Sequence, residues 1–287
     1  MHILEVENLK YVYSPDTPFK HSALNGISFS VEKNAIVGII GHTGSGKSTL
    51  LQLLNGLLKP SSGCIKFGGV DIWENPKKIS DIRFKIGLVF QYPEYQLFEE
   101  TVWKDIAYGP KNMKLSTLEI ESRVSKASQI VSLDKKLLNK SPFDLSGGEK
   151  RRVAIAGIMA MEPDIIIFDE PTAGLDPIGR ETVLKAINEY RENYGATVII
   201  VSHSMEDMAY ICDKILVLND GNLVMYDTVD NVFANALKLK EIGLNIPIIT
   251  SVMLSLKERG FDVPTDIFTV EAAAKALITK IDGGKKR

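Results

Sequence analysis

Cysteine is scarce in this sequence, and long uninterrupted apolar runs are missing from it. Its two cysteines, Cys64 and Cys212, lie far apart without the CxxC spacing typical of zinc or redox sites, so we expect buried thiols in a reducing compartment. No apolar run approaches the roughly 18 residues that a membrane-spanning helix needs. The first residues, MHILEVENLK, also lack the pattern of a secretion signal. We therefore expect the chain to stay in the cytosol, where any role in transport would require separate membrane partners.

An excess of charge of either sign is also lacking. The 287 residues include 34 Lys and Arg against 36 Asp and Glu, for a formal net charge of -2. This balance provides no global positive field that would attract nucleic acid or anionic lipid. Hydrophobic residues make up 45% of the chain and charged residues 24%, as is typical of globular proteins. The length allows one large or two small domains with a substantial core.

Short apolar runs in the first 67 residues indicate β-strands. Three of them, ILEVENL, ISFSVE and CIKFGG, are separated by Gly, Pro and Ser clusters. A further run, AIVGII, is continuously apolar, as expected of a buried parallel strand. A Gly-rich turn and the helical pattern STLLQLLNGLL follow it. The sequence therefore predicts a strand, a loop and a helix in direct succession.

The rest of the chain alternates helical and strand patterns. Helical periodicity predicts an insert over about residues 93–161, with helices at VWKDIAYG, TLEIESRVSKASQIVSL and EKRRVAIAGIMAM. The strands DIIIF and TVIIVS then alternate with helices at 179–193 and 205–212, so we expect an α/β core with parallel strands. A hairpin of KILVLND and NLVMYD turns at Asp220 and Gly221. Helices within NVFANALKLKEIG, PIITSVMLSLKERG and TVEAAAKALITKI follow, and we expect a disordered end, GGKKR.

A phosphate-binding loop is expected between the strand AIVGII and the helix after it. GHTGSGKS matches the pattern GxxxxGK[ST], whose glycines let backbone N–H groups form an anion nest at a helix N-terminus. Lys47 would reach the β- and γ-phosphates of ATP, and the Ser48 hydroxyl would bind Mg²⁺. An ordinary Gly-rich turn is the alternative, which the flanking strand and helix disfavour. The expected ATP-binding residues are Gly41, His42, Thr43, Gly44, Ser45, Gly46, Lys47, Ser48 and Thr49.

Two acidic residues, Asp169 and Glu170, end the apolar strand DIIIF. Ligands of α/β sheets bind at the carboxyl ends of the parallel strands. Asp169 is suited to hold Mg²⁺, and Glu170 can act as the general base or orient the water that attacks the γ-phosphate. In isolation, two acids that merely end a strand in solvent are an equal alternative.

The segment LSGGE forms a small polar turn before a helical pattern. Ser146 is well placed as a helix cap, and Gly147 and Gly148 expose backbone amides that could bind an anion. By itself, the segment is more typical of a helix cap than of a ligand site.

Taken in order, GHTGSGKST, LSGGEKRR, IIIFDEPTAGLDP and VSHSMED resemble the motifs of ABC transporter ATP-binding subunits, from Ile3 to about Phe233. The resemblance implies a P-loop NTPase (RecA-like) fold with a parallel-sheet core, an antiparallel β subdomain, a helical insert and a C-terminal helical extension. It implies an ABC ATPase domain over residues 1–234. Residues 235–287 would form the extension and strengthen a dimer.

The resemblance also implies roles for single residues. Two subunits of the family dimerise head to tail, so that Ser146, Gly147 and Gly148 would complete the partner's site, with Asp176 at the dimer contact. A strand-end histidine is more often structural, but here His203 would hold the γ-phosphate. Gln91 would touch Mg²⁺ and the attacking water. Tyr13 would stack on adenine, with Tyr11 as the alternative, and either could instead be a core aromatic.

Further segments resemble the ATPases of energy-coupling-factor importers, which take up cobalt or vitamins. These segments are QYPEYQLFEETVWKDIAYGP, TAGLDP and the helical tail, whereas Glu149 replaces the more usual glutamine of the family. The resemblance implies a second ABC ATPase subunit, identical or related, and a peripheral position at the cytoplasmic face of the membrane. A transmembrane coupling protein would bind the groove near Gln91 and 93–110, and a membrane subunit would choose the substrate.

Two other functions share some of these sequence features. A cytosolic ABC-type ATPase acting on DNA or ribosomes is disfavoured because only about 50 residues separate Gln91 from LSGGE, too few for a coiled-coil arm. The balanced charge also provides no basic stripe, and we expect no nucleic-acid partner. A P-loop kinase would use the same phosphate loop but leaves LSGGE and His203 unexplained.

Overall fold

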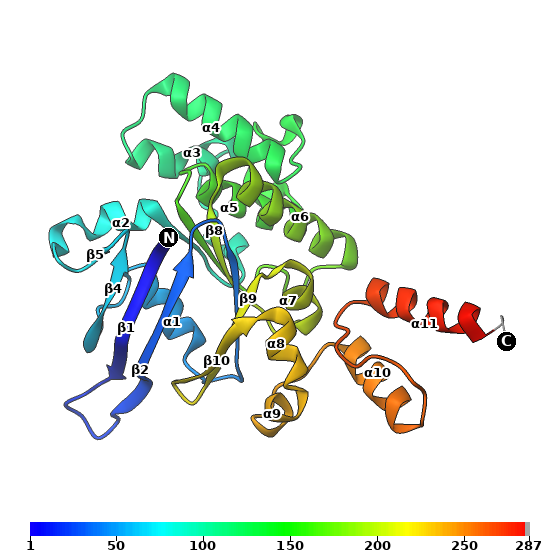
Figure 1. Cartoon of the computed structure of the whole chain (residues 1–287). Helices are drawn as coiled ribbons and strands as arrows, with labels where there is room; N and C mark the ends of the chain where they lie inside the picture. Colours follow the sequence, from blue (N-terminus) through cyan, green and yellow to red (C-terminus); the bar gives the residue numbers. More distant parts are fainter. Residues whose placement is uncertain (285–287) are drawn as a thin grey trace.

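The computed structural model describes residues 1–284 and contains two β-sheets (Figure 1). The smaller sheet has four antiparallel strands in the order β2-β1-β4-β5, which confirms the antiparallel subdomain. Long strands form here because apolar residues alternate with polar ones, as expected of a sheet with one buried face. The strands are β1 His2–Tyr13, β2 His21–Glu32, β4 Ser62–Phe67 and β5 Val70–Asp71.

The larger sheet has six strands in the order β10-β9-β3-β8-β7-β6. Five neighbouring strands run parallel, from β9 to β6, and β10 pairs antiparallel with β9 at the edge. Their continuous apolar runs are buried on both faces, as a parallel sheet covered by helices requires. The strands are β3 Ile36–Ile40, β6 Ile86–Val89, β7 Ile165–Asp169, β8 Thr197–Val201, β9 Lys214–Asn219 and β10 Asn222–Thr228.

Helices cover the larger sheet, and the predicted insert contributes three of them (Figure 1). Helix α5 packs against α3 and α4, and buried side chains of all three join the core cluster that contains Phe168. Four short 3-10 turns link these elements. The helices are α1 Lys47–Leu54, α2 Ile79–Lys85, α3 Val102–Asn112, α4 Thr117–Ile130, α5 Gly147–Met159, α6 Pro177–Tyr194 and α7 Met205–Ile211. The turns are η1 Pro76–Lys78, η2 Pro93–Gln96, η3 Lys135–Leu137 and η4 Pro142–Asp144.

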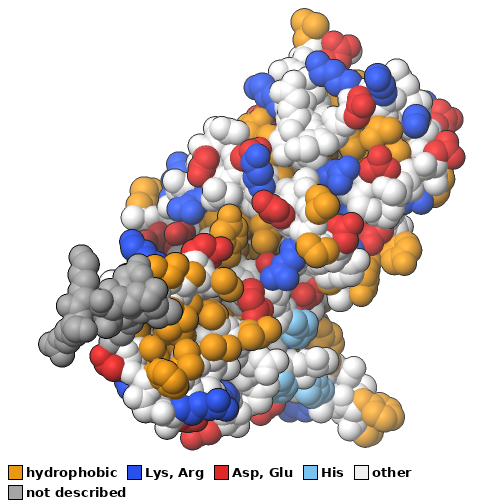
Figure 2. All heavy atoms as spheres, turned by 90° about the vertical axis from the view of Figure 1, so that its right-hand side faces the viewer, with side chains coloured by type: hydrophobic (Ala, Val, Ile, Leu, Met, Phe, Trp, Pro, Cys, Tyr) orange, Lys and Arg blue, Asp and Glu red, His pale blue; other side chains and the backbone are white. Residues whose placement is uncertain are grey.

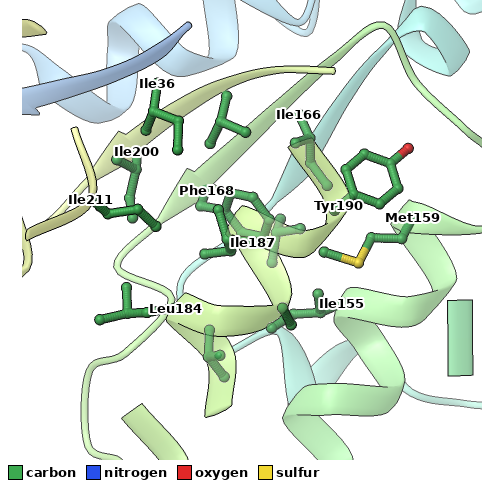
Figure 3. Close-up of a cluster of buried hydrophobic side chains, with 14 of the residues drawn as sticks. Ile36, Ile155, Met159, Ile166, Phe168, Leu184, Ile187, Tyr190, Ile200 and Ile211 are labelled. Carbon is green, nitrogen blue, oxygen red and sulfur yellow. The ribbon is translucent and has the colours of Figure 1, made fainter. Parts of the chain in front are cut away.

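Two apolar cores fix the sheet between its neighbours. In the first, Phe168 of β7 packs with Ile187 and Tyr190 of α6, all fully buried (Figure 3). The second core lies between the two sheets and includes the buried leucines of α1. Because α1 follows the phosphate loop and β7 ends in Asp169, these cores hold rigidly the elements on either side of the expected site.

The C-terminal extension consists of helices α8 Val229–Ala234, α9 Ala236–Glu241, α10 Ile248–Glu258 and α11 Val270–Gly284. Apolar side chains as far as Ile246, and again Leu254 and Phe268, pack on the main core, beyond the predicted boundary at residue 234. Residues of α10 and α11, among them Met253 and Ala273, form a small core of their own. The predicted division into 1–234 and 235–287 therefore stays a prediction.

Several sequence expectations differ from the structure. Strand β6 and helix α2 were not predicted, and the helix expected within NVFANALKLKEIG is divided at Asn235, where ψ is 41°. Both cysteines are free and, as whole residues, only partly buried. The expectation of a buried thiol was wrong for Cys64, whereas the Cys212 thiol packs against the main core and its burial raises its pKa. The first two residues of the expected disordered end, GGKKR, belong to α11, and the other three lie outside the described residues.

Candidate active site

The phosphate loop connects the buried strand β3 to helix α1, as the sequence predicts. Gly46 has a φ of 102°, and a Cβ there would lie 2.6 Å from the carbonyl oxygen of Ala23. Gly41 is equally constrained, because a Cβ would lie 2.5 Å from the carbonyl oxygen of Leu218. Only glycine fits both positions, so the loop can turn tightly and present its N–H groups at the start of α1.

Lys47 lies folded over this loop. Its Nζ donates hydrogen bonds to the carbonyl oxygens of Gly41, at 2.6 Å, and of His42, at 2.9 Å. Burial lowers the pKa of Lys47, while Glu170 and Asp169 raise it in opposition. An ammonium has three donors, so one remains for a phosphate oxygen.

Oxygen ligands suitable for Mg²⁺ meet where α1 begins and β7 ends. The Ser48 hydroxyl donates to Asp169 Oδ2 at 3.5 Å, and the Gln91 side chain lines the same cavity. Burial raises the pKa of Asp169, although Lys47 and the Ser48 hydrogen bond act in the opposite direction. Within residues 1–284, no group of three or more His, Cys, Asp or Glu side chains could hold a metal. The available donors fit Mg²⁺, which proteins commonly bind through one or two carboxylates together with substrate phosphates.

Glu170 has a strained backbone and a buried carboxylate. Its φ of 52° is unusual for a non-glycine residue, and its N–H donates to the carbonyl oxygen of Val201 at 3.0 Å. Oε2 accepts the His203 backbone N–H at 3.3 Å, while the buried Oε1 has no hydrogen-bond partner within residues 1–284. Burial is the main reason that the pKa of Glu170 rises to about 7, and the charge of Asp169 adds to the effect. A carboxylate with this pKa is suited to general-base catalysis near neutral pH.

His203 follows strand β8 and lies beside Glu170. Its Nε2 is 3.5 Å from Glu170 Oε1, and 61% of its side chain is exposed. Partial burial and the charge of Lys47 lower the pKa of His203, which favours the neutral imidazole. The ring is therefore accessible to a ligand in the cavity.

Tyr13 defines the other end of the cavity. Its hydroxyl is 3.1 Å from Thr49 Oγ1, which connects it to the phosphate loop. Tyr11 packs edge-on against Tyr13 with ring centroids 4.8 Å apart and joins the core between the sheets. The structure thus places Tyr13, and not Tyr11, in the cavity lining. Sequence reasoning missed three further lining residues, His21, Ala23 and Val201, of which His21 is paired with Tyr13 across the β1–β2 ladder.

One cavity of about 380 Å³ collects most of the predicted site residues. This volume is in the range of small-molecule sites. The predicted residues outside its lining are Gly41, His42, Ser45, Ser146, Gly147 and Gly148. Those that line it are Tyr13, Thr43, Gly44, Gly46, Lys47, Ser48, Thr49, Gln91, Asp169, Glu170 and His203.

The LSGG turn lies at the N-terminus of α5. Ser146 forms a capping box with Glu149, which confirms the expected helix cap. The Ser146 hydroxyl donates to Glu149 Oε2 at 2.6 Å, and the Glu149 N–H donates back to that hydroxyl at 3.4 Å. The Ser146 backbone N–H also donates to Glu149 Oε2, at 2.8 Å. The two hydrogen bonds that this carboxylate accepts lower the pKa of Glu149, with the larger effect from the hydroxyl. Asp176 likewise caps α6 by accepting the Gly179 N–H at 2.7 Å.

A second, mainly apolar groove of about 360 Å³ lies between η2, α3 and α5. Exposed aromatic rings border it, with Phe98 packed edge-on against Tyr108 at 4.9 Å. The segment from Pro93 to Phe98, which lies just after Gln91, forms part of its wall. One short segment therefore borders both hollows: Gln91 lines the cavity, and the residues from Pro93 to Phe98 line the groove.

Comparisons with known proteins agree with this geometry. Residues 24–173 match the family model described as ABC transporter. The chain is 52% identical over 98% of its length to the energy-coupling factor transporter ATP-binding protein EcfA2 of Caldanaerobacter subterraneus, and 51% identical over 99% to that of Clostridium acetobutylicum. Each match covers 99% of the relative.

Solved structures show the same fold. The structure of cbiO1 from Clostridium perfringens, described as part of the ABC transporter complex cbiONQ, has a TM-score of 0.75 and 40% identity, covering 88% of this chain and 98% of that one. A dimeric ATP-binding cassette bound to ADP and Pi has a TM-score of 0.71 and 28% identity, covering 79% and 98%.

Proposed function

Because the chain belongs to the ABC transporter family, as an ATPase of the energy-coupling factor type, we propose that it powers the uptake of a metal ion such as cobalt or of a vitamin. ATP hydrolysis coupled to transport is the activity of this family. The observation that carries the proposal is the convergence of the phosphate loop, Asp169, Glu170 and His203 on one cavity. The cargo class rests on the similarity to energy-coupling factor proteins and to cbiO1.

In the proposed mechanism, loop amides and Lys47 bind the β- and γ-phosphates of ATP while Tyr13 stacks on the base. Ser48, Asp169 and Gln91 would hold Mg²⁺, which supplies positive charge to the phosphates. Glu170, with its raised pKa, accepts the proton of the attacking water. His203, next to Glu170, donates a hydrogen bond to the γ-phosphate and responds to its release.

The second ATPase subunit completes each site in this proposal. Ser146, Gly147 and Gly148 line no part of their own chain's cavity, and they are available to the γ-phosphate of a partner, identical or related. Exposed apolar side chains gather over the C-terminal helices (Figure 2). This apolar surface supports the prediction that the extension strengthens the dimer. Its exposed side chains include Ile248, Val252, Phe261, Val270 and Ile278.

Membrane subunits would bind at the apolar groove. Among residues 1–284, no helix has the length and apolar character needed to cross a bilayer. A transmembrane coupling protein that inserts apolar helices beside Phe98 and Tyr108 would hold the chain peripherally at the cytoplasmic face. A separate membrane subunit would select the cargo, and the lack of net positive charge argues against a nucleic-acid partner.

A product assay tests the enzymatic part of the proposal. Purified protein with Mg²⁺ and labelled ATP should release free phosphate, and a labelled small acceptor would instead identify a kinase. Glu170→Gln should bind ATP but stall hydrolysis and elute as an ATP-bound dimer from a sizing column, whereas Ser146→Ala in that background should weaken the dimer. Purification of the native complex in detergent, with identification of its membrane proteins and cargo, tests the transport part. A complex without membrane proteins would overturn that part.

A further inference from the structure

A buried arginine of the helix that follows the LSGG turn is bound to the segment that follows Gln91. The Arg151 side chain of α5 is 3% exposed, and its guanidinium contacts Glu94 of η2 through two hydrogen bonds. Nε donates to Glu94 Oε2 at 3.0 Å, and an Nη donates to Oε1 at 2.8 Å. This paired geometry is the strongest and most directional that a carboxylate and a guanidinium can form.

The same guanidinium is bound to the turn that follows Glu170. Its other Nη donates to the carbonyl oxygen of Pro171 at 3.4 Å and to that of Ala173. The N–H of Ala173 donates in turn to the carbonyl oxygen of Glu170 at 3.2 Å. Arg151 therefore bridges two segments that each carry a residue of the candidate site, Gln91 and Glu170.

Both segments need such support. The residue after Gln91, Tyr92, has a φ of 54°, and Glu170 has a φ of 52°, conformations that cost free energy in non-glycine residues. The Tyr92 ring also lies over the guanidinium, 5.7 Å from its centre. A buried arginine is costly unless a carboxylate neutralises it, so displacement of Glu94 disturbs all of these contacts together.

We propose that Arg151 is a positioning residue for ATP hydrolysis, which locks the wall of the apolar groove to the loop that carries Glu170. Glu94 lies between Pro93 and Gln96, which both belong to that wall. A molecule that binds in the groove and displaces η2 therefore moves Glu94 and, through the ion pair, the Arg151 guanidinium. Arg151 transmits the displacement to the Pro171–Ala173 turn and thus to the Glu170 carboxylate. The inference rests on the proposed ATPase function and adds to it a physical link from groove to catalytic base.

Glu94→Gln tests the link, because it keeps the shape of the side chain but removes its charge. We expect kcat to fall about 10- to 100-fold, as small misplacements of catalytic groups do, with KM and the calorimetric affinity for a nonhydrolysable ATP analogue within about twofold of the parent. Trp73→Phe leaves Trp103 of α3, a helix that lines the groove, as the single tryptophan. Binding of the analogue should change Trp103 fluorescence in this background, and Glu94→Gln should abolish the change.

Arg123→Lys is the matched control. Arg123 also pairs with carboxylates, of Glu119 and Glu162, and donates to the Met161 carbonyl oxygen, but it contacts neither Glu94 nor the Glu170 turn. This variant should keep both the kcat and the Trp103 response, and Glu94→Asp, which retains the charge, should recover part of each.

Three outcomes would overturn the link: parental kcat and Trp103 response in Glu94→Gln, equal losses in Arg123→Lys, or no Trp103 response in a parent that binds the analogue. If Glu94→Gln does not fold, Arg151→Lys decides by the same criteria, because lysine keeps the charge but loses the paired geometry. The fluorescence response needs no hydrolysis. A parent that responds but releases no phosphate would therefore contradict the proposed ATPase function and not the link.

Discussion

The raised pKa of Glu170 predicts that Glu170→Gln stabilises the nucleotide-free protein above about pH 4.5, with the full effect above about pH 7. Burial raises this pKa from 4.5 to about 7, so the folded protein holds the proton more tightly than the unfolded chain. The free energy of unfolding therefore falls as the pH rises from about 4.5 to about 7, and the loss is complete above this window. Glutamine resembles the protonated acid in shape and cannot ionise. The free energy of unfolding of the variant therefore does not fall over this pH range.

The size of the effect follows from the same values. The change from 4.5 to about 7 corresponds to about 3 kcal/mol, at about 1.4 kcal/mol for each tenfold change in proton affinity. Glu170 is 7% exposed, so solvent screens little of this cost. For a chain of this length, a gain of about 3 kcal/mol raises the melting temperature by about 6 °C. Below pH 4.5, parent and variant should melt together.

Thermal unfolding of the two proteins at pH 5 and pH 8 measures this difference. Glu121→Gln, an exposed substitution on α4, is the control and should leave the melting temperature unchanged at both values. The parent's kcat/KM should rise through about pH 7, because the ionised carboxylate that destabilises the fold is also the proposed base. The reasoning fails if Glu170→Gln gives no stabilisation at pH 8, or an equal one at both pH values.

Three other variants test separate parts of the site. Lys47→Ala should lower the calorimetric affinity for ATP about 10- to 100-fold, because no other Lys or Arg of residues 1–284 lines the cavity, and unchanged affinity would contradict the phosphate cradle. Tyr13→Ala should lower the calorimetric affinity for ATP about fivefold because stacking on the base is lost, whereas Tyr13→Phe should keep the affinity. Equal losses in the two variants would instead assign the effect to the tyrosine hydroxyl, which is bonded to Thr49. Deletion of residues 247–287 removes the small core of α10 and α11 and the contacts of Leu254 and Phe268 with the main core. The truncated chain should still bind ATP but show weaker dimerisation by ultracentrifugation, whereas a folded truncated chain without ATP binding would contradict a separate role for the extension.

The phosphate loop and the strand ends could be predicted because their requirements are local. Gly46 must adopt a left-handed conformation, and Lys47 must begin a helix a short turn after a buried strand. Both requirements are met within a few consecutive residues. The acidic pair at the end of β7 is similarly local, since an apolar run and the next two residues define it.

The parts that sequence reasoning missed depend on distant partners. His21 enters the cavity because β1 and β2 pair in a register interrupted by several irregularities, and no local pattern specifies these. Strand β6 has four apolar residues, too few for periodicity to separate strand from helix. Arg151 was expected only as part of a helix, because Glu94, its partner, is 57 residues away.

Hydrogen bonding at the LSGG turn connects the cap expected from sequence with the proposed role between subunits. In the single chain the Ser146 hydroxyl donates to Glu149, so its proton is already in use. A γ-phosphate from a partner must replace this carboxylate as the acceptor, and the two anions repel when close. Glutamine, the usual residue of the family, could accept the same hydrogen bond without charge. Only the donated proton would change acceptor, because the hydroxyl oxygen can accept the Glu149 N–H in both states. A sequence pattern that indicates a helix cap is therefore compatible with the proposed role between subunits.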